Sequence, residues 1–96
     1  MTFDFNSLPA ENPASQKTVR AVANKFTKMA MEQAGFEDSA KNFVILRGRL
    51  FAVLCSKGDS KEGGRVTYGQ TRKWFKVKSV PAPILKSIKL DGLVKI

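Results

Sequence analysis

The sequence predicts a small α+β fold, in which one N-terminal amphipathic helix packs on an antiparallel sheet of three to five strands, followed by a short C-terminal helix or hairpin. Three observations predict it. Apolar residues recur at helical spacing before Gly35, two apolar runs flank Gly48, and residues 72–80 alternate along their length. A chain of 96 residues that is 43% hydrophobic and 26% charged has the composition of one globular domain.

The first residues of the chain predict an extended arm rather than a packed element. Residues 1–12 lack helical periodicity and end in turn-forming residues, so we assign residues 13–96 to a single small α+β domain. Phe3 and Phe5 share one face of such an arm, with Leu8 close by. We expect them to hold the arm against the domain, or alternatively against a partner.

The first helix has both end signals and a periodic apolar stripe. Asn12 is a good N-cap, and Pro13 suits the first helical position, where its missing N–H is not needed. The stripe consists of Val19, Val22, Ala23, Phe26, Met29, Ala30 and Ala34. Gly35 fits the left-handed position that ends a helix, which sets Phe36 against Met31. The stripe therefore predicts a core-facing helix.

Two apolar runs, 43–46 and 49–55, predict the first strands. Gly48 between them indicates a hairpin turn or, alternatively, a bulge in one long strand. Neither run alternates, and continuously apolar strands need cover on both faces. One helix covers only one face, so the C-terminal segment, the arm or a second copy of the chain must cover the other. A homodimer is therefore one alternative.

The second half of the chain predicts the remaining strands. A polar, glycine-rich loop at 56–64 precedes a short strand at 65–68 and a longer one at 72–80, which Pro81 ends. Residues 84–96 favour a short helix that stops before Gly92, with 93–96 as a closing strand. The alternative is a hairpin that turns at Asp91-Gly92.

The charge distribution predicts a polyanionic partner. The net charge is +9 and the isoelectric point is about 10.1. Residues 1–42 hold five cations and five acids, whereas residues 43–96 hold twelve cations and three acids. The alternative explanation, that lysines protect exposed strand edges, requires only a few charges.

The residue types argue against an enzyme. The chain has no histidine, and its one cysteine has no histidine to activate it. The glycines do not form a phosphate-binding motif, and neither zinc nor calcium would find enough ligands, so we expect no metal or cofactor. We interpret Cys55 as a buried thiol in a reducing compartment. The longest apolar run, residues 50–55, is too short to span a membrane, and no signal peptide is evident, so we expect a soluble cytoplasmic protein.

The candidate site is a basic surface of the predicted sheet. On the strand 72–80, Trp74 shares a face with Arg72, Lys76 and Lys78. The proposed nucleic-acid-binding residues are Arg47, Arg49, Lys57, Lys61, Arg65, Tyr68, Arg72, Lys73, Trp74, Lys76 and Lys78. The cations would hold phosphates while Trp74, with Tyr68 as a second candidate, would stack on a base. Equally, Trp74 could be a core residue whose N–H binds a carbonyl.

These residues predict binding to single-stranded DNA or RNA somewhat more than to a duplex, because unpaired bases are free to stack on a sheet. The first helix offers Gln16, Lys17, Arg20 and Asn24, so it could also contact duplex DNA. One alternative is a small protein-interaction module that docks its basic face on an acidic partner and so inhibits or adapts a larger machine. Another is a structural component of a ribonucleoprotein.

Overall fold

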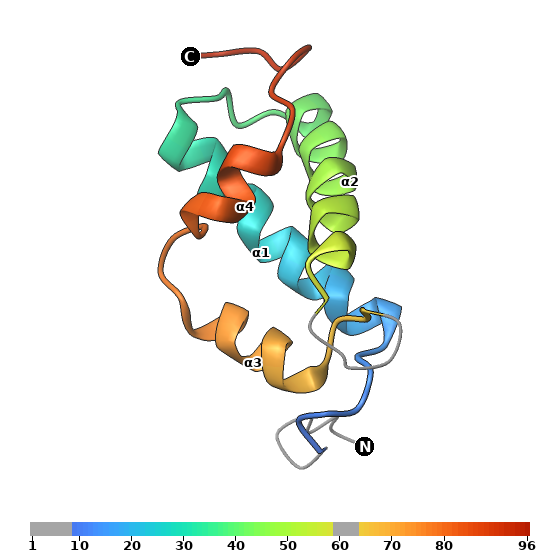
Figure 1. Ribbon diagram of the computed structural model, residues 1–96. Coiled ribbons are helices and arrows are strands. Elements are labelled where there is room, and N and C mark those ends of the chain that lie inside the picture. Colours follow the sequence, from blue (N-terminus) through green and yellow to red (C-terminus); the bar gives the residue numbers. More distant parts are fainter. Residues whose placement is uncertain (1–8, 59–63) are drawn as a thin grey trace, which may run out of the picture.

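Four helices make up the secondary structure of the computed structural model, which describes residues 9–58 and 64–96 (Figure 1). They are α1 (Gln16–Ala34), α2 (Ala40–Ser56), α3 (Tyr68–Lys76) and α4 (Ala82–Ser87). The predicted α+β class is wrong, since the described residues contain no sheet. Their only strand-like pairings are two isolated bridges, Pro13 with Thr67 and Phe36 with Lys95.

Helix α1 confirms the predicted N-terminal helix, although it begins later than expected. Ser15 rather than Asn12 caps it, because the Ser15 hydroxyl accepts the Thr18 N–H at 3.2 Å. Gly35 ends it in the left-handed conformation at φ 73°. Asn12 lies in a turn before the helix, and its carbonyl accepts the Tyr68 N–H at 3.0 Å. Residues 1–8 of the predicted arm, with Phe3, Phe5 and Leu8, lie outside the described residues.

Helix α2 replaces the predicted hairpin, so Gly48 is neither a turn nor a bulge. The Ser39 hydroxyl caps the helix by accepting the Asn42 N–H at 3.2 Å. The residues buried along it are spaced by four: Asn42, Leu46, Leu50 and Leu54. A continuously apolar run fits a buried helix as well as a buried strand, and this stripe is the signal that separates them.

Helix α3 replaces both predicted strands of the region 65–80. The Thr67 side chain caps it by accepting the Gln70 N–H at 3.3 Å. Thr67, Thr71 and Trp74 are buried and follow the i, i+4, i+7 rule of a helix. Residues 72–80 alternate in sequence, but Trp74 also fits the helical spacing set by Thr67 and Thr71. The fold adopts the helical spacing as far as Lys76.

The C-terminal region forms the helix that the sequence favoured over a hairpin. Ile84 of α4 and Ile88, its C-cap, are both buried. The predicted closing strand is reduced to a pairing of the last residues with the turn after α1. The Glu37 N–H donates to the Val94 carbonyl at 2.9 Å, and the Ile96 N–H donates to the Gly35 carbonyl at 3.0 Å.

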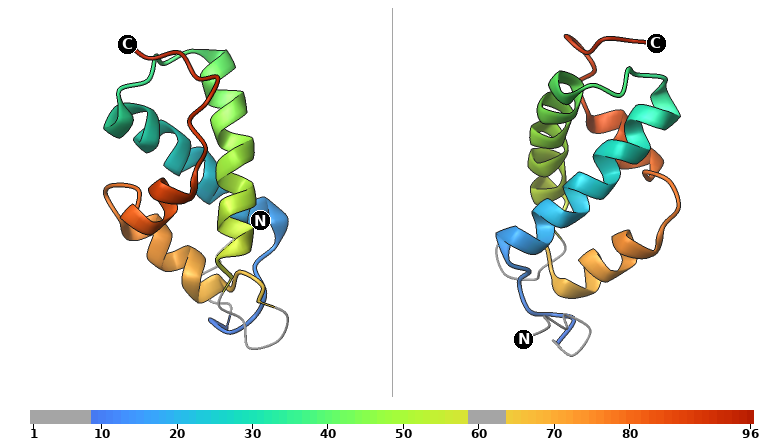
Figure 2. Two further views of the ribbon diagram at one scale, coloured as in Figure 1. Left: turned by 45° about the horizontal axis from the view of Figure 1, so that its top comes forward. Right: turned by 180° about the vertical axis from the view of Figure 1, so that it is seen from behind.

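The helices pack around one buried apolar cluster. α1 and α2 lie side by side, with the start of α1 near the end of α2, while α3 packs on α1 and α4 packs on α2 (Figure 2). In the cluster the rings of Phe26 and Trp74 meet edge to face, with 6.3 Å between their centroids. None of the helices in residues 9–58 and 64–96 has the length and hydropathy to cross a membrane.

A buried amide fixes the C-terminal segment to the start of α2. The Asn42 Nδ2 donates to the carbonyls of Glu37 and Val94, both at 2.8 Å. Its Oδ1 accepts the Val94 N–H at 3.0 Å. We call this group of three hydrogen bonds the Asn42 clasp.

Candidate nucleic-acid interface

The predicted binding residues are spread over helices instead of one sheet surface. Arg47 and Arg49 lie on α2, and Lys57 is the exposed residue that ends it. The Arg49 guanidinium donates to the Lys89 carbonyl at 2.6 Å, so this residue links α2 to the chain after α4. Lys61 lies outside the described residues. These positions do not form the continuous sheet face that the sequence predicted.

All of the other candidates lie within one stretch of chain, residues 64–90, which we call the basic segment. It contains α3, the connection to α4, and α4 itself. It holds seven cations and no carboxylate: Arg65, Arg72, Lys73, Lys76, Lys78, Lys86 and Lys89. All five lysines are exposed, as is Arg65, and Arg72 is half-buried. The basic segment is therefore the part of the chain in which exposed positive charge is concentrated.

Lys86 and Lys89 belong to the basic segment but were not among the predicted residues. The signal was present, because no acid occurs between Glu62 and Asp91, so the acid-free run continues beyond the predicted strand. The predicted strand ended before Pro81, and the last predicted site residue was Lys78. In the helical fold the connection 77–81 leads directly from α3 to α4 along one side of the molecule (Figure 1).

Trp74 is a core residue and not a stacking platform. Its side chain is only 8% exposed, and its ring packs against Phe26. Of the two interpretations that the sequence left open, the core interpretation is the one the fold adopts. Tyr68 begins α3 and is half-buried.

Helix α1 anchors the basic segment at two points. The Lys25 ammonium donates to the Phe75 carbonyl at the end of α3 and lies 5.9 Å from the centroid of the Phe75 ring. The Gln33 amide oxygen accepts the Val80 N–H at 2.7 Å. Because both ends of the connection are held, the cations between them are carried on fixed backbone.

None of the carboxylates in residues 9–58 and 64–96 belongs to the basic segment. Three of the five, Glu32, Glu37 and Asp38, belong to the last turn of α1 and the turn that follows it. The others, Glu11 and Asp91, lie outside the limits of the basic segment. The positive potential of residues 64–90 is therefore not offset by an acid of the same stretch.

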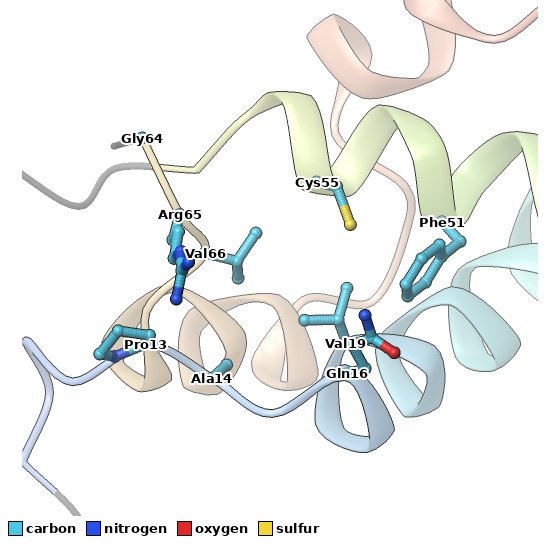
Figure 3. A pocket seen from close by; sticks show the side chains of 9 residues that line it. All are labelled: Pro13, Ala14, Gln16, Val19, Phe51, Cys55, Gly64, Arg65 and Val66. Carbon is cyan, nitrogen blue, oxygen red and sulfur yellow. The ribbon is translucent and has the colours of Figure 1, made fainter. Parts of the chain in front are cut away.

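A pocket of about 460 Å³ opens between the start of α1, the end of α2 and the chain before α3 (Figure 3). Its lining residues are Pro13, Ala14, Gln16, Val19, Phe51, Cys55, Gly64, Arg65 and Val66. The lining offers only three polar side chains, those of Gln16, Cys55 and Arg65. They do not form a nucleophile with a neighbouring base.

Cys55 is exposed, which corrects the prediction of a buried thiol. The apolar run that it ends is a helix and not a buried strand, and Cys55 lies on the side of α2 opposite Leu46. Within residues 9–58 and 64–96, no cluster of Cys, Asp or Glu side chains is arranged to hold a metal ion.

Comparisons with models of protein families, with curated proteins and with solved structures found no match.

Proposed function

We propose that this chain is a non-enzymatic nucleic-acid-binding protein whose basic segment contacts the phosphate backbone. The observation that supports this proposal is the concentration of seven cations, with no carboxylate, in residues 64–90. Five of these cations are exposed lysines on or beside two short helices. Lysine ammonium groups neutralise phosphates and release their counterions, which gives affinity without sequence preference.

The burial of Trp74 changes the preferred form of the ligand. The preference for single strands depended on an open ring that could stack on bases, and Trp74 is packed in the core. Phosphate contacts alone serve duplexes and single strands alike. We therefore propose the phosphodiester backbone as the recognised chemistry and keep no stacking role for Trp74.

The proposed role is intracellular. A thiol that is exposed and unpaired, as Cys55 is, persists most readily in a reducing compartment. Nucleic acid, the proposed partner, is also found there.

The test compares two triple variants that lose the same charge from different surfaces. Lys73→Ala/Lys76→Ala/Lys78→Ala removes exposed cations of the basic segment. Lys17→Ala/Lys28→Ala/Lys41→Ala removes exposed cations of α1 and the start of α2. The affinity of fluorescent duplex DNA, single-stranded DNA and RNA is measured by anisotropy over a range of salt concentrations. Each lost phosphate contact should flatten the slope of log K against log salt by about 0.9 on duplex DNA.

The first variant should bind more weakly with a flatter salt dependence, and the control should bind like the wild type. Equal losses in both variants would mean that net charge alone attracts the ligand, and the assigned surface would be wrong. If the wild type binds none of the three probes at low salt, the proposed function fails. Tryptophan fluorescence should change little on binding, because the Trp74 ring is buried.

A further inference from the structure

The side of α2 opposite its buried leucines is apolar and largely exposed. We call it the outer face of α2 and define it by Val44, Ile45, Gly48, Phe51, Ala52 and Cys55. Val44 is 56% exposed, Gly48, Ala52 and Cys55 are exposed, and the other two are half-buried. These residues follow one another at helical spacing over about three turns.

An apolar helix face on a water-exposed side indicates a missing partner. The opposite side of α2 already supplies Leu46, Leu50 and Leu54 to the core. A helix that is apolar on both sides is normally buried on both sides. In the described part of the chain, α1 and α4 pack on α2, and Phe51 and Cys55 face the pocket at the start of α1, whereas Val44, Gly48 and Ala52 stay exposed.

Helix α2 supplies only cations to the border of this face. Helix α2 contains no carboxylate, and Lys41, Arg47 and Arg49 are its charged residues. Arg20 of α1 extends the border, with its guanidinium 5.7 Å from the centroid of the Phe51 ring. The Arg47 guanidinium lies 5.6 Å from the centroid of the Phe43 ring. The contact with Phe51 places the Arg20 charge beside the outer face, and Arg47 is exposed and precedes Gly48 in the chain.

We propose that the outer face of α2 binds an amphipathic helix of a protein partner, with apolar residues facing Val44, Gly48 and Ala52 and with acidic residues on its flanks. A Cβ added to Gly48 would meet nothing within 4 Å, so a partner helix can approach the backbone closely there. Carboxylates on its flanks would meet Arg20 and Arg47.

The border charges argue against a second copy of the chain as the occupant. Two outer faces packed together would bring Lys41 and Arg47 of both copies close to one another, with no carboxylate on either helix. Each copy also carries a net charge of +9, so the two molecules repel one another. An acidic helix instead complements both the apolar face and its border.

The experiment selects from a displayed library of helical peptides as long as α2. Their apolar face is fixed, and their flanking positions vary among Glu, Gln and Lys. Selection uses the whole chain, followed by affinity measurements against two variants. Gly48→Gln/Ala52→Gln places neutral polar side chains on the outer face, and Ala21→Gln places one on the exposed side of α1 as the control. Circular dichroism confirms that all variants stay folded.

Selected peptides should carry Glu on their flanks, and their affinity should fall at least about tenfold for the Gly48→Gln/Ala52→Gln variant, a difference of about 1.4 kcal/mol. The Ala21→Gln variant should bind them like the wild type. The proposal is overturned if selection enriches Lys or Gln flanks, enriches nothing, or yields peptides that bind both variants equally. A wild-type dimer in sedimentation that the Gly48→Gln/Ala52→Gln variant dissociates would assign the face to a second copy instead.

The same variants separate this proposal from nucleic-acid binding. The Gly48→Gln/Ala52→Gln variant should keep the wild-type affinity for DNA and RNA, because the basic segment is unchanged. If that variant loses nucleic-acid binding, the outer face contacts nucleic acid and the docking proposal fails.

Discussion

At the scale of single residues, the Asn42 clasp is the most specific polar feature of the core. The side chain is fully buried, and its amide makes three hydrogen bonds to backbone groups of Glu37 and Val94. A buried amide is tolerated only when its donors and acceptor are satisfied, and this one satisfies backbone groups of two segments at once.

Replacing Asn42 by leucine should therefore destabilise the fold by about 1–3 kcal/mol, because the partner groups on Glu37 and Val94 lose their hydrogen bonds. Chemical denaturation would measure the change in the free energy of unfolding. Asn24→Leu, on the exposed side of α1, is the matched control and should change stability by less than about 0.5 kcal/mol. Equal stability of the two variants would show that the clasp contributes nothing measurable.

The residue scale also shows what the sequence could not decide. Trp74 fits two patterns, because it lies among alternating residues and also stands at helical spacing from Thr67 and Thr71. Local pattern alone does not choose between these periods. The edge-to-face contact with Phe26 is made by residues far apart in the chain, and it is this packing that places Trp74 in the core.

At the scale of elements, α1 was predictable and α2 was not. The first helix has a clear apolar stripe and a glycine at its end, so only its start differed, at Ser15 instead of Asn12. The second helix is apolar on its core side and on its outer face, which removes the amphipathic signal. Gly48 therefore led to the prediction of a turn. In the structure residue 48 is helical, because the packing of Leu46 and Leu50 outweighs the low helix propensity of one glycine.

Two glycines offer a test of these helix assignments. Gly48→Ala should stabilise the protein by up to about 1 kcal/mol, since its Cβ enters open space and alanine is the better helix former. The Cβ added by Gly35→Ala would also meet open space. This change should nevertheless destabilise the protein by about 1–2 kcal/mol, because residue 35 has a φ of 73°. Circular dichroism would measure the melting temperatures of the two variants. They should shift in opposite directions from the wild-type value, by about 4–8 °C per kcal/mol. A lower melting temperature for Gly48→Ala would contradict a helical residue 48.

At the scale of the whole molecule, positive charge opposes the compact state. Seventeen cations face eight acids, and the described acids lie mostly at one end of α1. Like charges on such a surface repel, and salt screens that repulsion. The sequence alone predicts that the excess charge lies in the second half of the chain. Only the structure shows that much of this charge lies on and beside two helices, α3 and α4.

The melting temperature should therefore rise when sodium chloride is increased from low to physiological concentration. Differential scanning calorimetry would measure it without any ligand. The Lys73→Ala/Lys76→Ala/Lys78→Ala variant, which carries less excess charge, should respond less to salt. A melting temperature that falls with added salt would mean that surface ion pairs outweigh the repulsion.

The Asn42 clasp has a consequence for the order of folding events. It joins residues 52 positions apart, whereas α1 and α2 are neighbours in the chain and pair across a short turn. Contacts between neighbours form early, and a contact that closes so long a stretch forms late. Losing the clasp should thus accelerate unfolding and leave refolding almost unchanged. The contacts of the last few residues then set how long the protein stays folded. They also set its resistance to proteases that cleave opened molecules.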